Sequence, residues 1–139
     1  MLWVERGEAS FVSAHEVKIV HEGNEKTIRG EHIILATGSR PRHLPQYEID
    51  EQSILTSDGI EHIADYPESL VIVGAGVIGC EYATIFANLG KTKVYLIDRA
   101  DRILPFEDTD ISTIVSENLE EKGVTIHHNA QLERLEILG

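Results

Sequence analysis

The hydrophobic positions in the first part of the chain follow the pattern of β-strands. Two short alternating runs, Ser10–Val12 and Val17–Val20, are typical of half-buried strands. Gly23-Asn24 follows the second run and predicts a hairpin turn. Ile33–Ala36 is a continuous apolar run, which predicts a strand buried on both faces. We therefore expect residues 1 to about 40 to be rich in β-structure.

A region punctuated by proline follows, with Pro41, Pro45 and Pro67 along it. Its one helical signal covers about Ser57–Ala64, which predicts a short helix. Proline cannot donate a backbone hydrogen bond and interrupts regular structure. We expect this region to connect two structural units.

From Ser69 onward the pattern changes to strands that alternate with helices. Leu70–Val73 and Lys93–Ile97 are apolar runs of strand length, and Val77–Leu89 between them has helical periodicity. Gly90 stands where a left-handed helix cap belongs. The apolar positions at helical spacing predict the buried stripe of this helix, and Ala83 and Ala87 continue Gly79 as a small-residue face against the sheet. The stripe is Ile78, Tyr82, Ile85, Phe86 and Leu89.

A second helix is predicted to begin at an N-cap, either Asp108 or Asp110, and to end at Gly123. A third strand begins at Val124–His127, and Leu132–Leu138 is a candidate fourth. The alternation of strands and helices predicts an α/β fold with a parallel sheet and right-handed crossovers. The expected inner face of this helix is Ile111, Ile114, Val115 and Leu119.

The segment from Gly74 to Gly79 matches G-x-G-x-x-G, begins directly after a predicted strand and opens a predicted helix. This context predicts a Rossmann-type βαβαβ unit that binds a dinucleotide. Gly74 permits the tight turn, Gly76 lets a pyrophosphate approach the backbone, and Gly79 lets helix and strand pack closely. The helix N-terminus, at Val77 and Ile78, presents backbone N–H groups to the phosphates. The alternative is a tight strand-to-helix turn that holds no ligand.

Asp98 lies 19 positions after Gly79 and ends the second predicted strand. A carboxylate at this position accepts hydrogen bonds from the adenosine ribose and repels a 2′-phosphate, which favours NAD over NADP. Arg99 and Arg102 point the other way, because a guanidinium nearby could receive that phosphate. The alternative for Asp98 is a solvated strand end.

With these residues in view, the chain resembles the flavin-dependent pyridine nucleotide-disulfide oxidoreductases, a family that includes dihydrolipoyl dehydrogenases and soluble transhydrogenases. Ile34–Pro41 resembles the strand that closes the FAD domain of this family, and Val71–Ala83 resembles the start of its NAD domain. Asp101–Pro105, followed by Asp108 and Asp110, resembles the stretch after the second strand. The resemblance covers nearly the whole chain.

The resemblance implies a division into residues 1–43, the C-terminal part of an FAD-binding domain, a connecting segment at 44–66, and residues 67–139, a partial NAD(P)-binding domain. Thr37 and Gly38 would belong to the edge of the FAD site. The full enzyme would use FAD and NAD, would be a homodimer, and would pass hydride between nicotinamide and flavin. The redox cysteine pair and catalytic histidine of the disulfide-reducing members have no counterpart here. We therefore expect an internal fragment, with no catalytic residue and no activity alone.

Composition narrows the remaining possibilities. The formal net charge is -12, which disfavours nucleic-acid binding, and no apolar stretch is long enough to span a membrane. The single cysteine, Cys80, suits a reducing cytoplasm. We expect Cys80 to be a small buried hydrophobic residue rather than a nucleophile. The seven histidines lack the spacing of a metal site, so we expect no metal.

Two further functions stay open on the sequence alone. One is a non-catalytic module that binds NAD or a protein partner without turnover. The other is a β-rich interaction protein whose glycine loop holds nothing. Incomplete sheets with unpaired edges also predict self-association.

Overall fold

The computed structural model describes residues 2–137 and divides the chain into two units. The first unit runs to Arg40 and the second begins at Pro41. Each unit has a sheet of its own.

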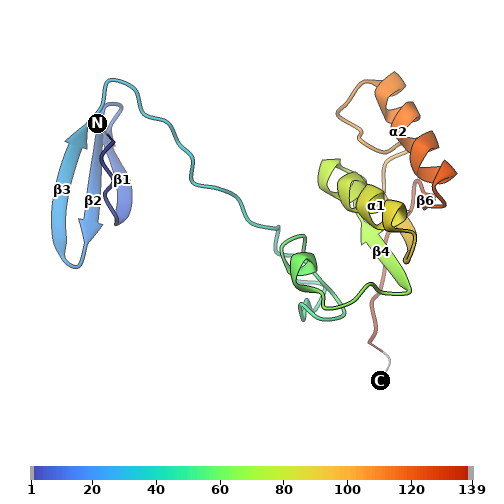
Figure 1. Ribbon diagram of the computed structural model, residues 1–139. Coiled ribbons are helices and arrows are strands. Elements are labelled where there is room, and N and C mark those ends of the chain that lie inside the picture. The colour runs from blue at the N-terminus through green and yellow to red at the C-terminus, as the bar shows by residue number, and fades with distance from the viewer. Residues whose placement is uncertain (1, 138–139) are drawn as a thin grey trace. The chain divides into compact units, whose positions relative to one another are not determined.

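The first unit is an antiparallel sheet of three strands in the order β1-β2-β3 (Figure 1). The strands are β1 (Glu8–Ser13), β2 (Glu16–His21) and β3 (Asn24–Arg29). The register of β1 against β2 shifts between Phe11 and Ser13. The two strands and the hairpin turn that the sequence predicts at Gly23-Asn24 are confirmed.

No residue of the first unit is fully buried within the described range 2–40. The prediction of a buried strand at Ile33–Ala36 is wrong: these residues are extended but unpaired, and Ile34 is 90% exposed. An apolar strand is stable only where neighbouring strands accept its hydrogen bonds and both faces are covered. No strand in the part of the chain that the structure describes pairs with it.

The second unit alternates strands with helices. Its strands are β4 (Ser69–Val73), β5 (Lys93–Ile97) and β6 (Thr125–His127), and its helices are α1 (Val77–Leu89) and α2 (Thr109–Glu121). The short helix that the sequence predicts before β4 is a single 3₁₀ turn, η1 (Gly59–His62). Asp50 holds the loop before it, because its Oδ1 accepts three backbone hydrogen bonds at 2.8–2.9 Å. These bonds, led by that from Ile54, lower the pKa of Asp50.

The three strands form a parallel sheet in the order β4-β5-β6, with α1 crossing from β4 to β5 and α2 from β5 to β6. Val71 pairs with Tyr95, and Tyr95 pairs with Thr125. The prediction of an α/β fold with a parallel βαβαβ unit is confirmed. The carboxyl ends of β4 and β5 lie side by side, which brings the loops after them together.

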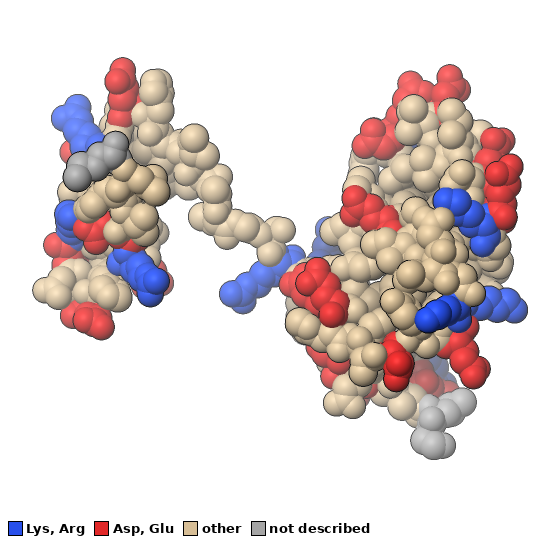
Figure 2. All heavy atoms as spheres, in the orientation of Figure 1, with Lys and Arg blue, Asp and Glu red and all other residues tan. Residues whose placement is uncertain are grey.

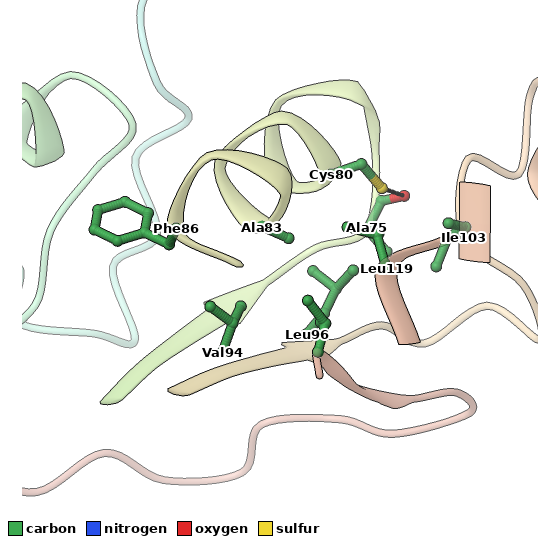
Figure 3. Packing of buried hydrophobic residues seen from close by; sticks show 9 residues of the cluster. Ala75, Cys80, Ala83, Phe86, Val94, Leu96, Ile103 and Leu119 are labelled. Atoms are coloured by element: carbon green, nitrogen blue, oxygen red, sulfur yellow. Dashed lines mark hydrogen bonds between the residues drawn. The ribbon is translucent and has the colours of Figure 1, made fainter. Parts of the chain in front are cut away.

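The core lies between the sheet and the two helices (Figure 3). Val94 and Leu96 of β5 meet Ala83 and Phe86 of α1, while Leu119 comes from α2. Alternate residues of a strand point to opposite faces, so Val71 and Val73 of β4 point away from the helices. Both are more than half exposed, so the second face of this sheet is uncovered.

The predicted buried stripe of α1 is largely wrong. Phe86 is buried as predicted and Tyr82 packs against the core, but Ile78, Ile85 and Leu89 are exposed. The other buried residues of α1 are Cys80 and Ala83. Small side chains let the helix lie close to the sheet, so the small-residue face buries Ala83 as expected. In α2 the predicted inner face is half right: Leu119 is buried and Val115 packs against the core, whereas Ile111 and Ile114 are exposed. Ser112, which was not predicted, is buried.

The predicted ends of the helices agree with the structure better than their predicted buried faces do. Gly90 caps α1 in the left-handed conformation, with φ 66°, and its N–H bonds to the carbonyl of Ala87. Asp108, rather than Asp110, is the N-cap of α2, and its side chain accepts from the N–H of Asp110 at 2.9 Å. The predicted fourth strand is wrong for residues 132–137, which form no strand, and residue 138 lies outside the described range.

Acidic side chains dominate the surface of the second unit (Figure 2). Glu117, Glu120 and Glu121 of α2 are all exposed, as expected for a solvated helix face. None of the helices within residues 2–137 has the length and apolar character needed to cross a membrane.

Candidate functional site

The glycine-rich segment forms the turn from β4 into α1, at the carboxyl end of the parallel sheet. Gly74 has φ 110°, a conformation that side chains of L-residues rarely adopt. Its N–H bonds to the carbonyl of Ile97 at 2.8 Å, which joins the start of the loop to the end of β5. The turn therefore requires glycine at this first position.

Gly79 and Gly76 differ in the space that a Cβ atom would have. A Cβ on Gly79 would overlap the carbonyl oxygen of Gly74, so close packing of α1 on the loop requires the missing side chain. At Gly76, by contrast, φ is −76° and no atom of the described residues lies within 4 Å of where a Cβ would be. The protein itself does not require glycine there. The missing Cβ leaves open space directly above the backbone, which fits a pyrophosphate group.

The N-terminus of α1 has free capacity to bind an anion. Gly76 is the N-cap and has no side chain, and within residues 2–137 no side chain caps this end. The first N–H groups of a helix have no partner inside the helix and carry a partial positive charge. Val77 and Ile78, both 57% exposed, are the first two residues of α1. The residues present therefore fit a dinucleotide.

Asp98 directly follows β5 and faces the glycine loop. Its Oδ2 accepts a hydrogen bond from the N–H of Ala75 at 2.6 Å, and its Oδ1 accepts from the N–H of Ala100 at 2.7 Å. The carboxylate is therefore part of the same site as the loop, rather than a strand end in contact with solvent alone. Each carboxylate oxygen has two lone pairs, so capacity is left for a hydroxyl group of a ligand.

The two arginines near Asp98 have different surroundings. The guanidinium of Arg102 donates to the carbonyl oxygens of Pro105 and Glu107 at 2.9 and 3.0 Å, and so holds its own loop. Arg99 is exposed and adjoins Asp98 in the chain. Arg99 is therefore the better placed of the two to meet a 2′-phosphate.

Cys80 lies in the first turn of α1 and is 5% exposed. Its Sγ donates to the carbonyl of Ala75 at 3.5 Å (Figure 3). Burial, and secondarily the charge of Asp98, raises the pKa of the thiol to about 11. A thiol of this kind is protonated at neutral pH and is a poor nucleophile, which confirms the prediction of a small buried residue.

Thr37 and Gly38 belong to the first unit, apart from the glycine loop in the division of the chain. Both are exposed, and Gly38 has φ 76°, a backbone conformation that favours glycine. Within the second unit, the structure brings together Gly74, Gly76, Gly79 and Asp98.

Sequence reasoning missed two residues of the site. Ala75 is fully buried, and its carbonyl accepts from the N–H of Leu104 at 2.8 Å. Leu104 itself has φ 46°, unusual for a residue other than glycine. No pattern in the sequence marks these contacts, because both use backbone atoms that every residue has.

The chain is similar to known proteins over almost its full length. The sequence profile of the pyridine nucleotide-disulphide oxidoreductases matches residues 2–138. The dihydrolipoyl dehydrogenase of Bacillus subtilis is 42% identical over 133 residues, which are 96% of this chain and 29% of that protein. The soluble pyridine nucleotide transhydrogenase of Colwellia psychrerythraea is 42% identical over 132 residues, 94% of this chain and 28% of that protein.

Solved structures are also similar to this chain over most of its length. The crystal structure of LpdA from Mycobacterium tuberculosis superposes with a TM-score of 0.75 at 29% identity, over 96% of this chain and 30% of that one. The HOCl-induced flavoprotein disulfide reductase RclA from Escherichia coli gives a TM-score of 0.64 at 33% identity, over 92% of this chain and 29% of that one. The chain thus spans less than a third of the length of these relatives.

Proposed function

Since the chain belongs to the pyridine nucleotide-disulphide oxidoreductase family, we propose that it is the nucleotide-binding portion of an FAD-dependent oxidoreductase. The complete protein would pass hydride between a nicotinamide nucleotide and FAD, as a dihydrolipoyl dehydrogenase or a soluble transhydrogenase. The observation that carries this proposal is the glycine loop, with its open space at Gly76 beside an uncapped helix N-terminus. The N-terminus of α2, by contrast, is capped by the Asp108 side chain.

In this proposal the chain binds and orients the nucleotide, and none of its residues is catalytic. The backbone N–H groups at Gly76, Val77, Ile78 and Gly79 hold the pyrophosphate, because a helix N-terminus attracts anions. Gly74 shapes the turn that presents them. When bound, the two cofactors supply the redox chemistry, and the protein supplies position and electrostatics.

We propose NAD rather than NADP as the preferred nucleotide. The Asp98 carboxylate is held beside the loop, where it accepts from ribose hydroxyls and repels a 2′-phosphate. Arg99 opposes this preference, and Arg102 does so less because its guanidinium bonds to two carbonyls. The balance between Asp98 and Arg99 therefore decides the nucleotide.

Three elements of the proposal rest on the resemblance to the family. Thr37 and Gly38 contribute to the edge of an FAD site, the complete enzyme is a homodimer, and residues 1–43, 44–66 and 67–139 are its FAD, connecting and NAD(P) parts. A fourth element, action in the cytoplasm, rests on the single cysteine, which suits a reducing compartment.

The experiment is a calorimetric titration of the chain with NADH and, separately, with NADPH. We expect saturable binding of NADH, tighter than that of NADPH by about tenfold, or about 1.4 kcal/mol. Gly76→Ala is the matched variant, because its Cβ enters space that only a ligand would occupy. This substitution should weaken the binding of NADH by about tenfold, again about 1.4 kcal/mol. It should leave the circular dichroism spectrum unchanged.

Two outcomes would overturn the proposal. One is a folded chain that binds neither nucleotide, which would favour an interaction module with a ligand-free loop. The other is Gly76→Ala binding NADH as tightly as the unchanged chain, because the nucleotide would then lie elsewhere. Equal or tighter binding of NADPH would overturn only the preference for NAD.

A further inference from the structure

Ala75, the middle residue of Gly74-Ala75-Gly76, is held from both sides by the segment that follows β5. Its N–H donates to Asp98 Oδ2 at 2.6 Å, and its carbonyl accepts from the N–H of Leu104 at 2.8 Å. Ala75 itself is fully buried, while Asp98 and Leu104 are partly buried. The peptide groups on both sides of Ala75 are thereby fixed in direction.

Asp98 is itself held firmly. Its Oδ1 accepts from the N–H of Ala100, and its backbone bonds to the carbonyl of His127 and the N–H of Ala130, at 2.7–3.0 Å. The carboxylate is thus fixed relative to both β6 and the loop after β5. A fixed acceptor loses little conformational entropy when it bonds to Ala75.

The donor on the other side of Ala75 belongs to an equally restrained segment. Ile103 is fully buried, and its carbonyl accepts from Ser112 Oγ of α2. Arg102 bonds to the carbonyls of Pro105 and Glu107, which closes the loop around Leu104. Leu104 keeps its left-handed conformation within these contacts.

We propose that Asp98 is a positioning residue of the glycine loop, which sets the loop conformation before any nucleotide binds. A loop with glycine at two of three positions has many accessible conformations when it is free. The bond from Ala75 to Asp98 removes most of them, so the N–H groups at the start of α1 are already aimed at the pyrophosphate. This role is additional to the ribose contact and rests on the proposed function for its purpose.

The experiment measures amide hydrogen exchange of the chain by NMR in the absence of nucleotide. Asp98→Ala is the informative variant, because it removes both carboxylate oxygens and with them the acceptor of the Ala75 N–H. We expect exchange of the Ala75 amide to accelerate by about tenfold or more, since a hydrogen bond to a charged group is lost. The Leu96 amide in β5 serves as the internal reference and should change by less than about twofold.

Asp101→Ala is the matched control, because it removes the same charge from an exposed neighbour that takes no part in these bonds. It should leave the Ala75 amide unchanged. If Asp98→Ala also destabilises β5, Arg102→Met serves instead, because it leaves the carboxylate in place and releases the loop around Leu104. Faster exchange of the Leu104 amide with a protected Ala75 amide then supports the proposal, because Asp98 still holds the Ala75 N–H. Faster exchange of the Ala75 amide in this variant would overturn it.

The proposal is overturned if the Ala75 amide exchanges at the same rate in Asp98→Ala and Asp101→Ala. A contact to ribose alone predicts that result, because no nucleotide is present. The outcome is independent of the titration with NADH. Faster exchange in a chain that binds no nucleotide would support the loop-positioning role and contradict the proposed function. Unchanged exchange in a chain that binds NADH would support the proposed function and overturn the loop-positioning role.

Discussion

Gly76 and Gly79 are separated by one turn of α1 and lack a side chain for opposite reasons. At Gly79 the protein fills the space, because the carbonyl of Gly74 lies where a Cβ would be. At Gly76 the space is open. The two positions therefore separate the contribution of the loop to stability from its contribution to binding.

Gly79→Ala should destabilise the chain. Its Cβ would collide with backbone rather than with a flexible side chain, and overpacking of this kind costs about 1–3 kcal/mol. Urea denaturation measures the loss of unfolding free energy. Gly76→Ala is the control and should unfold at the same urea concentration as the unchanged chain, whereas an equal loss in both variants would contradict the argument.

Cys80 makes the stability depend on alkaline pH. Burial raises the pKa of its thiol from 9.0 to about 11 in the folded chain, so the folded state holds this proton more tightly than the unfolded state. The stabilisation is complete below about pH 9 and is lost as the pH rises to about 11. We expect the unfolding free energy to fall across that interval.

The measurement is urea denaturation at a series of pH values, with Cys80→Ala as the control. The variant lacks the thiol and should lose the part of the pH dependence that the thiol causes. A pH profile that is the same in both proteins would show that other groups are responsible.

The sequence indicated which residues meet at the site but not how they are joined. The glycine spacing and the acid after the second strand depend on chain order, which the sequence contains. The bonds from Ala75 to Asp98 and Leu104 depend on the tertiary structure and use backbone atoms. Residue types therefore gave no signal for them.

At the scale of elements, the start of α2 depends on the residue before it, Asp108. Asp108 precedes the helix and accepts from the N–H of Asp110, which satisfies one of the unpaired donors at this end. The carboxylate also interacts favourably with the helix dipole. Sequence reasoning offered both acids, and only the fold selects between them.

Asp108→Ala should lower the unfolding free energy by about 1 kcal/mol, because the cap is lost. Thermal denaturation followed by circular dichroism measures the effect. Asp108→Asn is the control, since its side-chain oxygen still accepts from the Asp110 N–H, and it should keep most of the stability. If the alanine and asparagine variants are equally unstable, charge rather than capping is the cause.

Element types and ends were predicted better than element faces. Glycine and aspartate mark helix ends locally, so the sequence identified Gly90 and narrowed the N-cap of α2 to Asp108 or Asp110. Which side of α1 packs on the sheet depends on how closely two surfaces approach. That distance favours Ala83 over the larger Ile85, and hydrophobic periodicity does not contain it.

At the scale of the whole chain, many large hydrophobic side chains are exposed to solvent. Val71 and Val73 of β4 lie on the uncovered face of the parallel sheet, and Ile34 and Leu35 of the first unit are exposed as well. Large apolar patches on a protein in water are sites of association. This agrees with a chain that spans less than a third of its relatives.

We expect the isolated chain to self-associate, and light scattering at increasing concentration measures it. Val71→Lys should shift the population toward the monomer, because a charge on the uncovered sheet face opposes burial. Asn88→Lys adds the same charge on the exposed surface of α1 and is the control. A monomer at every concentration would contradict the prediction.

The bond between Asp98 and Ala75 also limits how this family member could evolve. A descendant that adopted a phosphorylated nucleotide would ordinarily discard the acid beside the ribose. Under the proposed function, the same mutation would loosen the turn at Gly74–Gly76, so the first step would weaken binding of the old ligand before binding of the new one improved. Such a lineage would need a second acceptor for the Ala75 N–H beforehand, and the order of the two substitutions would matter.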